Sequence, residues 1–168
     1  MCAMIEMSWS MPLPESSRQP TYVERLLVHA LRQWVADRSR WSGVVLELNR
    51  ICGPHAATQI CEALDSAFET LGRHARRRVR LHRPVCCRIS HDETCLLNLI
   101  AARQNGADGH AHALIRWMVK SAFATELERD LDIVAGVLLE AGYTLEVRTR
   151  TANAETITMT PQLRSVRE

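Results

Sequence analysis

Apolar residues recur with the 3.6-residue period of an amphipathic helix over much of this chain, beginning just after Pro20. The clearest stretch has one apolar face, made of Val23, Leu26, Leu27, Ala30, Leu31, Trp34 and Val35. The opposite face, which we expect to meet solvent, carries Glu24, Arg25, Arg32 and Gln33. Such helices bury their apolar faces by packing against one another, so the pattern favours a helical bundle.

Several further helices have recognisable starts and stops. Pro54 suits the first position of a helix whose apolar face runs to Leu71, just before Gly72. Ser90 and Glu93 have the spacing of a capping box, which predicts the start of a helix that stops at Asn105-Gly106.

Two more helices are expected after Gly106. Asp108 suits the cap of a shorter helix that continues to Val119. A long final helix is then predicted from Phe123 to Ala141, with Gly142 as its stop signal.

Three segments have a different pattern. Residues 41–51 fit a helix, although Val44 to Leu46 also suits a short buried strand. Residues 73–89 lack helical periodicity and suit a short exposed strand or an extended linker. Beyond Gly142 the period changes to two, around Leu145 and again around Ile157, which predicts a β-hairpin.

These elements predict a mainly α fold, a compact bundle of five or six helices with a small C-terminal β-hairpin. Residues 1–20 contain three prolines and no apolar period, so we expect a flexible arm over 1–19. The single helical domain is expected over 20–160, with a tail at 161–168.

The chain has none of the features of an exported or membrane protein. It shows no secretory signal and no run of about 20 apolar residues, so we expect no membrane association. Six cysteines occur without an export signal, which favours free thiols or metal ligands in a reducing cytoplasm over a disulfide framework.

A His/Cys cluster lies in residues 82–95, where the spacing H-x₃-C occurs twice. Its candidate zinc ligands are His82, Cys86, His91 and Cys95. Two thiolates and two imidazoles suit a tetrahedral zinc site, and His91 and Cys95 project from one helix face. The alternative is that the cysteines simply fill space in the core, since Cys is among the most buried residue types.

Arginine is concentrated in one segment. Residues 71–90 hold seven of the chain's 21 basic residues and no acidic residue, so the remainder has 14 basic against 19 acidic residues. The candidate contacts to nucleic acid or to an acidic partner are Arg73, Arg76, Arg77, Arg78, Arg80 and Arg83. A solvated connection, or a partner for the acidic helix around Glu126 to Asp132, is the structural alternative. No aromatic residue interleaves the run, which disfavours a single-strand binder.

The sequence gives little support for catalysis. It contains no nucleophile elbow and no phosphate-binding glycine loop. Cys95 with His91 as its base is a conceivable nucleophile, but no third group orients the pair. Asp92 and Glu93 suit a structural role in the first turn of their helix.

The interpretation with fewest assumptions is a non-enzymatic, regulatory or adaptor protein that acts through protein–protein contacts and self-associates. It needs no cofactor. The alternative is a zinc-binding regulatory domain that uses the cluster at 82–95 and contacts nucleic acid through residues 73–83.

Overall fold

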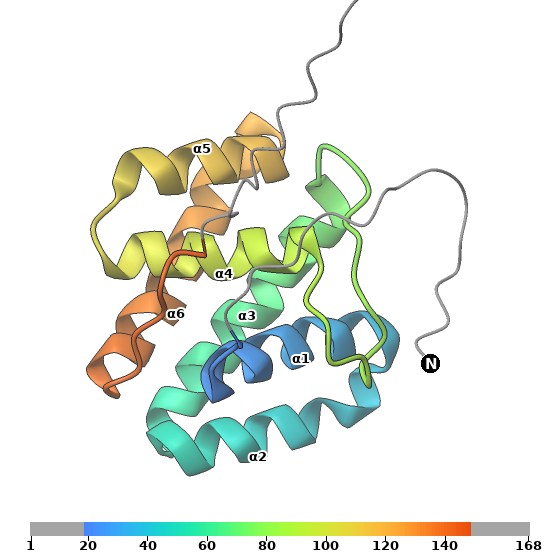
Figure 1. Ribbon diagram of the computed structural model, residues 1–168, viewed down its shortest axis with the longest axis vertical. Coiled ribbons are helices and arrows are strands. Elements are labelled where there is room, and N and C mark those ends of the chain that lie inside the picture. Colours follow the sequence, from blue (N-terminus) through green and yellow to red (C-terminus); the bar gives the residue numbers. More distant parts are fainter. Residues whose placement is uncertain (1–18, 149–168) are drawn as a thin grey trace, which may run out of the picture.

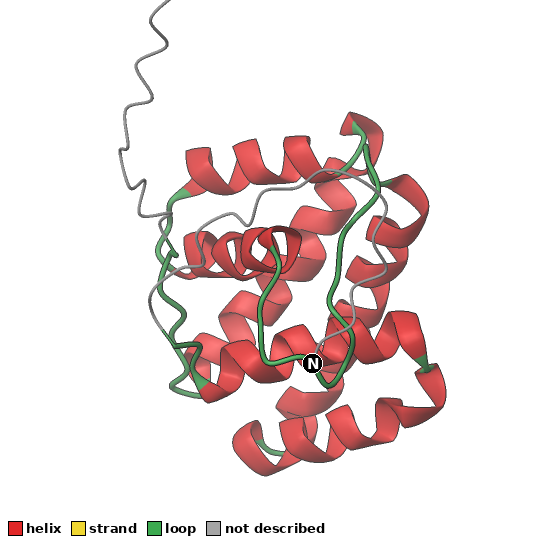
Figure 2. Cartoon of the chain, turned by 45° about the vertical axis from the view of Figure 1, so that its right-hand side comes forward, coloured by secondary structure: helices red, strands yellow, loops and turns green. Residues whose placement is uncertain are grey.

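The computed structural model describes residues 19–148, which form six α-helices joined by loops and two single-turn 3₁₀ helices (Figures 1 and 2). The helices are α1 (Tyr22–Ala36), α2 (Trp41–Cys52), α3 (Pro54–His74), α4 (His91–Gln104), α5 (Asp108–Met118) and α6 (Ala124–Glu140). The 3₁₀ helices are η1 (Arg38–Arg40) and η2 (Ser121–Phe123). The predicted mainly helical fold is thus confirmed for these residues.

Capping interactions define two of the helix starts. The predicted box before α4 is confirmed: the Glu93 N–H donates to Ser90 Oγ, and the Ser90 N–H donates to the Glu93 carboxylate. Thr21 and Glu24 form an equivalent box before α1. The predicted cap by Asp108 is wrong, because Ala107 holds the cap position of α5 and Asp108 instead pairs with Arg103.

Two glycines end elements where the chain needs a positive φ. Gly53, with φ of 82°, separates α2 from the helix that begins at Pro54. This break settles the ambiguous residues 41–51 as a helix. Gly142, with φ of 84°, follows α6, as its sequence position predicted.

The core lies between α3 and α6 and the helices that pack against them. Figure 1 shows α5, α4, α1 and α2 from top to bottom, with α3 and α6 running across them. α3 packs closely against α6 and α2, while α4 packs against α6 and α5. Every one of the six α-helices contributes fully buried apolar side chains to a single cluster, among them Leu27, Leu48, Ile60, Leu97, Ile115 and Leu131.

The polar side of α1 is covered, which contradicts the expectation that it meets solvent. Glu24, Arg32 and Gln33 are all buried, with exposed fractions of 0%, 4% and 7%. Loop residues near Cys86 lie against Arg32, and Arg148 lies against Glu24. Only Arg25 of the predicted polar set is exposed.

The predicted hairpin lies mostly outside the described residues. Its first segment, residues 145–148, is described and does not form a strand. This segment instead lies alongside α4. The Leu145 N–H donates to the Gln104 side chain, and the Arg148 N–H donates to the Asn98 side chain. None of the described helices is both long and apolar enough to span a membrane.

Candidate functional site

The arginine loop, defined here as residues 75–90, connects α3 to α4 without regular structure. Its beginning is tied to the end of α5. The Arg76 N–H donates to the Met118 carbonyl at 2.9 Å, and the Lys120 N–H donates to the His74 carbonyl at 3.1 Å. Ala75 and Val119 form an isolated antiparallel bridge between these bonds. The loop therefore contains no strand. Of the two structures predicted for this segment, it forms the extended linker.

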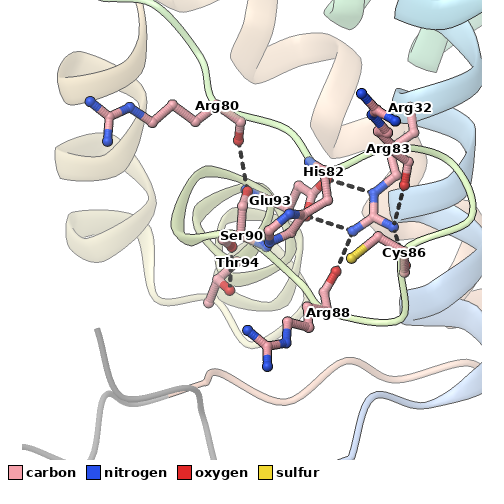
Figure 3. Close-up of polar contacts among 9 residues, drawn as sticks. All are labelled: Arg32, Arg80, His82, Arg83, Cys86, Arg88, Ser90, Glu93 and Thr94. Carbon is pink, nitrogen blue, oxygen red and sulfur yellow. Dashed lines mark hydrogen bonds and ion pairs between the residues drawn. The ribbon is translucent and has the colours of Figure 1, made fainter. Parts of the chain in front are cut away.

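Arg32 of α1 holds the second half of the loop. Its Nε and Nη2 atoms donate to the two carboxylate oxygens of Glu93 at 2.7 and 2.8 Å. Its remaining N–H groups donate to the backbone carbonyls of Arg83, Cys86 and Arg88 (Figure 3). A guanidinium has five N–H donors, so every donor of this buried side chain is used.

Glu93 is equally saturated as an acceptor. In addition to the two bonds from Arg32, it accepts from the backbone N–H of His82 at 3.2 Å and of Ser90 at 2.7 Å. A carboxylate offers about four acceptor positions, and all are occupied here. The side chain is completely buried.

The Arg32–Glu93 pair is thus a closed polar network in the protein interior. A buried ion pair must compensate the large cost of removing two charges from water, which requires good geometry and satisfied hydrogen-bonding groups. Both conditions are met, and the bonds reach the backbone of five loop residues, namely His82, Arg83, Cys86, Arg88 and Ser90. The pair therefore fixes the path of the loop.

A second carboxylate holds the first half of the loop. Asp92, which is buried, accepts two bonds from the Arg77 guanidinium, one of them at 3.1 Å from Nη1. It also accepts from the Arg80 N–H at 2.6 Å. The Arg77 guanidinium carbon lies 3.9 Å from the centre of the Trp117 ring, and His91 meets the same ring edge-on at 5.7 Å. The Asp92 bond raises the pKa of Arg77 above its usual range.

All six arginines proposed as partner contacts are exposed, but they differ in their engagement. Arg76 and Arg77 are bound to neighbouring elements, at Val119 and Asp92. Arg73 forms only an exposed ion pair with Glu69. The side chains of Arg78 and Arg83 form no hydrogen bond or ion pair with any residue between 19 and 148. Figure 3 shows the Arg80 side chain extending away from the Arg32–Glu93 pair.

The acidic helix is not the partner of these arginines. On α6, Glu128 and Asp132 pair with Arg103, and Asp130 pairs with the adjacent Arg129. The acids that do hold the loop are Asp92 and Glu93, and both are turned inward and buried. The structural alternative of a loop bound to α6 therefore finds no support among these contacts.

The four proposed zinc ligands are not brought together. His91 and Cys95 are neighbours, with Nε2 and Sγ 3.7 Å apart, as their spacing predicted. Cys86 is buried, and its backbone carbonyl accepts a hydrogen bond from Arg32. The backbone N–H of His82 donates to Glu93. Within residues 19–148, no three His, Cys, Asp or Glu side chains gather closely enough to hold a metal ion. The geometry gives the zinc hypothesis no support.

The geometry also weakens the idea of a cysteine nucleophile. Burial raises the pKa of Cys95 to about 11, and the Asp92 charge adds to this rise while Arg77 opposes it. A thiol with this pKa stays protonated at neutral pH, whereas nucleophilic cysteines depend on the thiolate.

A hollow of the described surface lies elsewhere, between α4, α5 and α6. It is open, with a volume of about 670 Å³, and its lining is Arg103, Asp108, Gly109, His112, Ala113, Arg116 and Glu128. Arg103 already pairs with Asp108, Glu128 and Asp132. The hollow is therefore built around a satisfied ion-pair cluster.

Sequence reasoning missed Arg32 and Trp117 as parts of this site. Arg32 looked like an ordinary residue on the polar side of α1, and nothing local signals its five bonds. Trp117 is 40 positions from Arg77 and supplies the aromatic contact that the arginine segment itself lacks. The one sequence signal for this network was Glu93, because the predicted capping box places it at the start of α4, directly after the loop.

No protein-family model matches this chain, and comparisons with curated proteins and with solved structures give no match. Its function must therefore be argued from its own geometry.

Proposed function

We propose that this chain is a non-enzymatic interaction protein, and that the arginine loop is its contact surface for an acidic protein partner. The observation that carries the proposal is the Arg32–Glu93 network, in which a buried pair makes two bonds within itself and five to the backbone of the loop. A fixed loop loses little conformational entropy on binding.

The charge of the loop surface supports an acidic partner. Arg78 and Arg83 are exposed, and no described residue neutralises them. The nearby acids Asp92 and Glu93 are buried behind the loop. Complementary charge across an interface favours the correct partner and accelerates association.

The test is the affinity for a fluorescein-labelled peptide of twelve residues, alternating glutamate and serine, measured by fluorescence anisotropy. We expect Arg78→Gln/Arg83→Gln to weaken binding about two- to thirtyfold, since each exposed charge pair contributes roughly 0.2–1 kcal/mol. Affinity should also fall as salt is raised.

Arg25→Gln/Arg50→Gln is the matched control. It removes the same charge from exposed positions on α1 and α2. Equal weakening by both double variants would show that net charge alone drives binding and would refute a specific loop surface.

Self-association stays a prediction. The unpaired edge of the predicted hairpin would favour it, and most of that hairpin lies outside the described residues. Analytical ultracentrifugation at micromolar concentration tests it, with a dimer as the expected result.

A further inference from the structure

A large aromatic side chain of α5, Trp117, lies beside the arginine loop. Trp117 is 40% exposed, and Arg77 covers it at 3.9 Å. The loop and α5 are locked together beside this contact by the hydrogen bonds of Arg76 and Lys120. The indole is therefore held at a fixed place on the basic surface.

Arg77 differs in its role from the other loop arginines. Both of its terminal nitrogens donate to Asp92, so its fork is directed at a carboxylate of the chain itself. A guanidinium committed in this way cannot also bind a partner carboxylate with both nitrogens. It can support the indole from below, because a cation stacks well on the face of Trp.

The Trp117 side chain itself is not fully engaged. Among residues 19–148 its ring meets Arg77 and the edge of His91, and its indole N–H donates to none of them. Trp, Tyr and Arg are the residue types most enriched among binding hot spots. A partner therefore meets a partly exposed indole that is backed by Arg77 and lies beside the start of the arginine loop.

We infer that Trp117 is the anchor of the proposed interface, and that the partner is an acidic segment with an aromatic side chain among its carboxylates. The inference rests on the proposed function and adds the chemistry of the partner. Aromatic pairs contribute beyond their buried area, by an amount that corresponds to about a two- to tenfold change in affinity. The carboxylates of the partner would then pair with the exposed side chains of Arg78 and Arg83.

Two labelled peptides of twelve residues test this inference, one alternating glutamate with tyrosine and the other alternating glutamate with serine. The intact protein should bind the tyrosine peptide at least threefold tighter. Trp117→Ala should remove this preference and leave the affinity for the serine peptide almost unchanged. Trp117→Phe keeps a ring and should retain most of the preference.

Leu46→Ala is the matched control for Trp117→Ala, because it removes a large apolar side chain from the surface of another helix, α2, where Leu46 is 67% exposed. It should keep the full preference for tyrosine. Melting temperatures of all variants are compared first, and Trp117→Leu, which keeps an apolar side chain without a ring, carries the test if the Ala variant does not fold. A tyrosine preference that survives in a folded Trp117 variant lacking the ring, or that Leu46→Ala loses as fully as the ring-less Trp117 variant does, overturns the anchor.

The outcomes separate this inference from the proposed function. Binding of both peptides with equal affinity overturns the aromatic anchor and leaves the acidic-partner proposal standing. Binding of neither peptide overturns both. Tighter binding of a twelve-nucleotide oligo-dT than of either peptide overturns the choice of a protein partner, since bases also stack on tryptophan.

Discussion

The guanidinium of Arg32 and the carboxylate of Glu93 form a buried ion pair that joins α1 to α4 across 61 positions of sequence. Every hydrogen-bonding group of the two side chains is used, and all five bonds beyond those within the pair go to the backbone of the arginine loop. The pair thus links the helical core to the surface that we propose for binding.

Removing one member of this pair should strongly destabilise the fold. Glu93→Gln leaves the Arg32 charge buried without a counter-ion, and we expect a loss of about 3 kcal/mol in the free energy of unfolding. Urea denaturation measures the loss. Glu69→Gln, which removes a carboxylate from an exposed pair with Arg73, is the control and should cost less than about 1 kcal/mol. Equal effects in the two variants would contradict the structural role of Glu93.

The adjacent arginines Arg77 and Arg78 should respond differently to the same substitution. Arg77→Gln deprives the buried Asp92 of its ion pair and the Trp117 ring of its stacked cation, so we expect a loss of about 1–3 kcal/mol. Arg78→Gln should change stability by less than about 0.5 kcal/mol, because its side chain makes no bond to a described residue. Thermal unfolding of the two single variants, side by side, measures the difference. A larger loss for Arg78→Gln would invert our assignment of the two roles.

The stability of the fold should fall in acid partly through Glu24. Burial raises the pKa of Glu24, but hydrogen bonds from Arg148 and Thr21 outweigh it and leave the pKa below its usual value of 4.5. A carboxyl with a lowered folded-state pKa stabilises the protein above the unfolded-state pKa and loses this contribution as pH falls through the folded-state value.

Glu24→Gln provides the test of this acid dependence. We expect the variant to be less stable than the parent by about 2 kcal/mol at pH 7, and the gap to narrow as the pH falls below 4.5. Urea unfolding at pH 7, 5, 4 and 3 gives the two curves. A gap of constant size down to pH 3 would show that the Glu24 charge does not contribute.

The cysteines should differ widely in reactivity. Burial raises the pKa of Cys61 and of Cys95 to about 11 in each case, whereas Cys87 is exposed. A thiol of pKa 11 is about one-thousandth thiolate at pH 8, so iodoacetamide should modify Cys87 at least tenfold faster. Mass spectrometry of peptides after timed labelling resolves each site, and labelling in urea should make the rates similar. Rapid modification of Cys95 in the folded protein would revive its role as a nucleophile.

Local signals in the sequence were sufficient for most of the helices. The capping box at Ser90 and the glycine at 142 placed the start of α4 and the end of α6 because those signals act within a few residues. Residues 41–51 were ambiguous because short apolar runs suit both helix and strand. The solvent-facing assignment of Glu24 and Arg32 was wrong for a related reason, since periodicity cannot show which loop will cover a polar face.

The site depends on contacts that span long stretches of sequence. The arginine segment was visible from composition. The different roles of Arg77, which is anchored to Asp92, and Arg78, which bonds to no described residue through its side chain, were not, because both occupy the same basic run. This difference depends on Asp92 and on Trp117, which only the fold brings to Arg77. Similarly, the H-x₃-C spacing could not show that Cys86 lies apart from the adjacent pair His91 and Cys95.

Hydrogen–deuterium exchange of the arginine loop tests most directly whether the Arg32–Glu93 pair fixes this surface. Six amides of the loop are bonded to described residues, and four of them lie in its stretch 80–90: those of Arg80, His82, Cys86 and Ser90. We expect these four to exchange at least a hundredfold more slowly than an unstructured chain, and the protection of His82 and Ser90 to be lost in Glu93→Gln at a temperature where the variant is folded. Exchange of all four at the unstructured rate in the parent protein would contradict a preorganised loop.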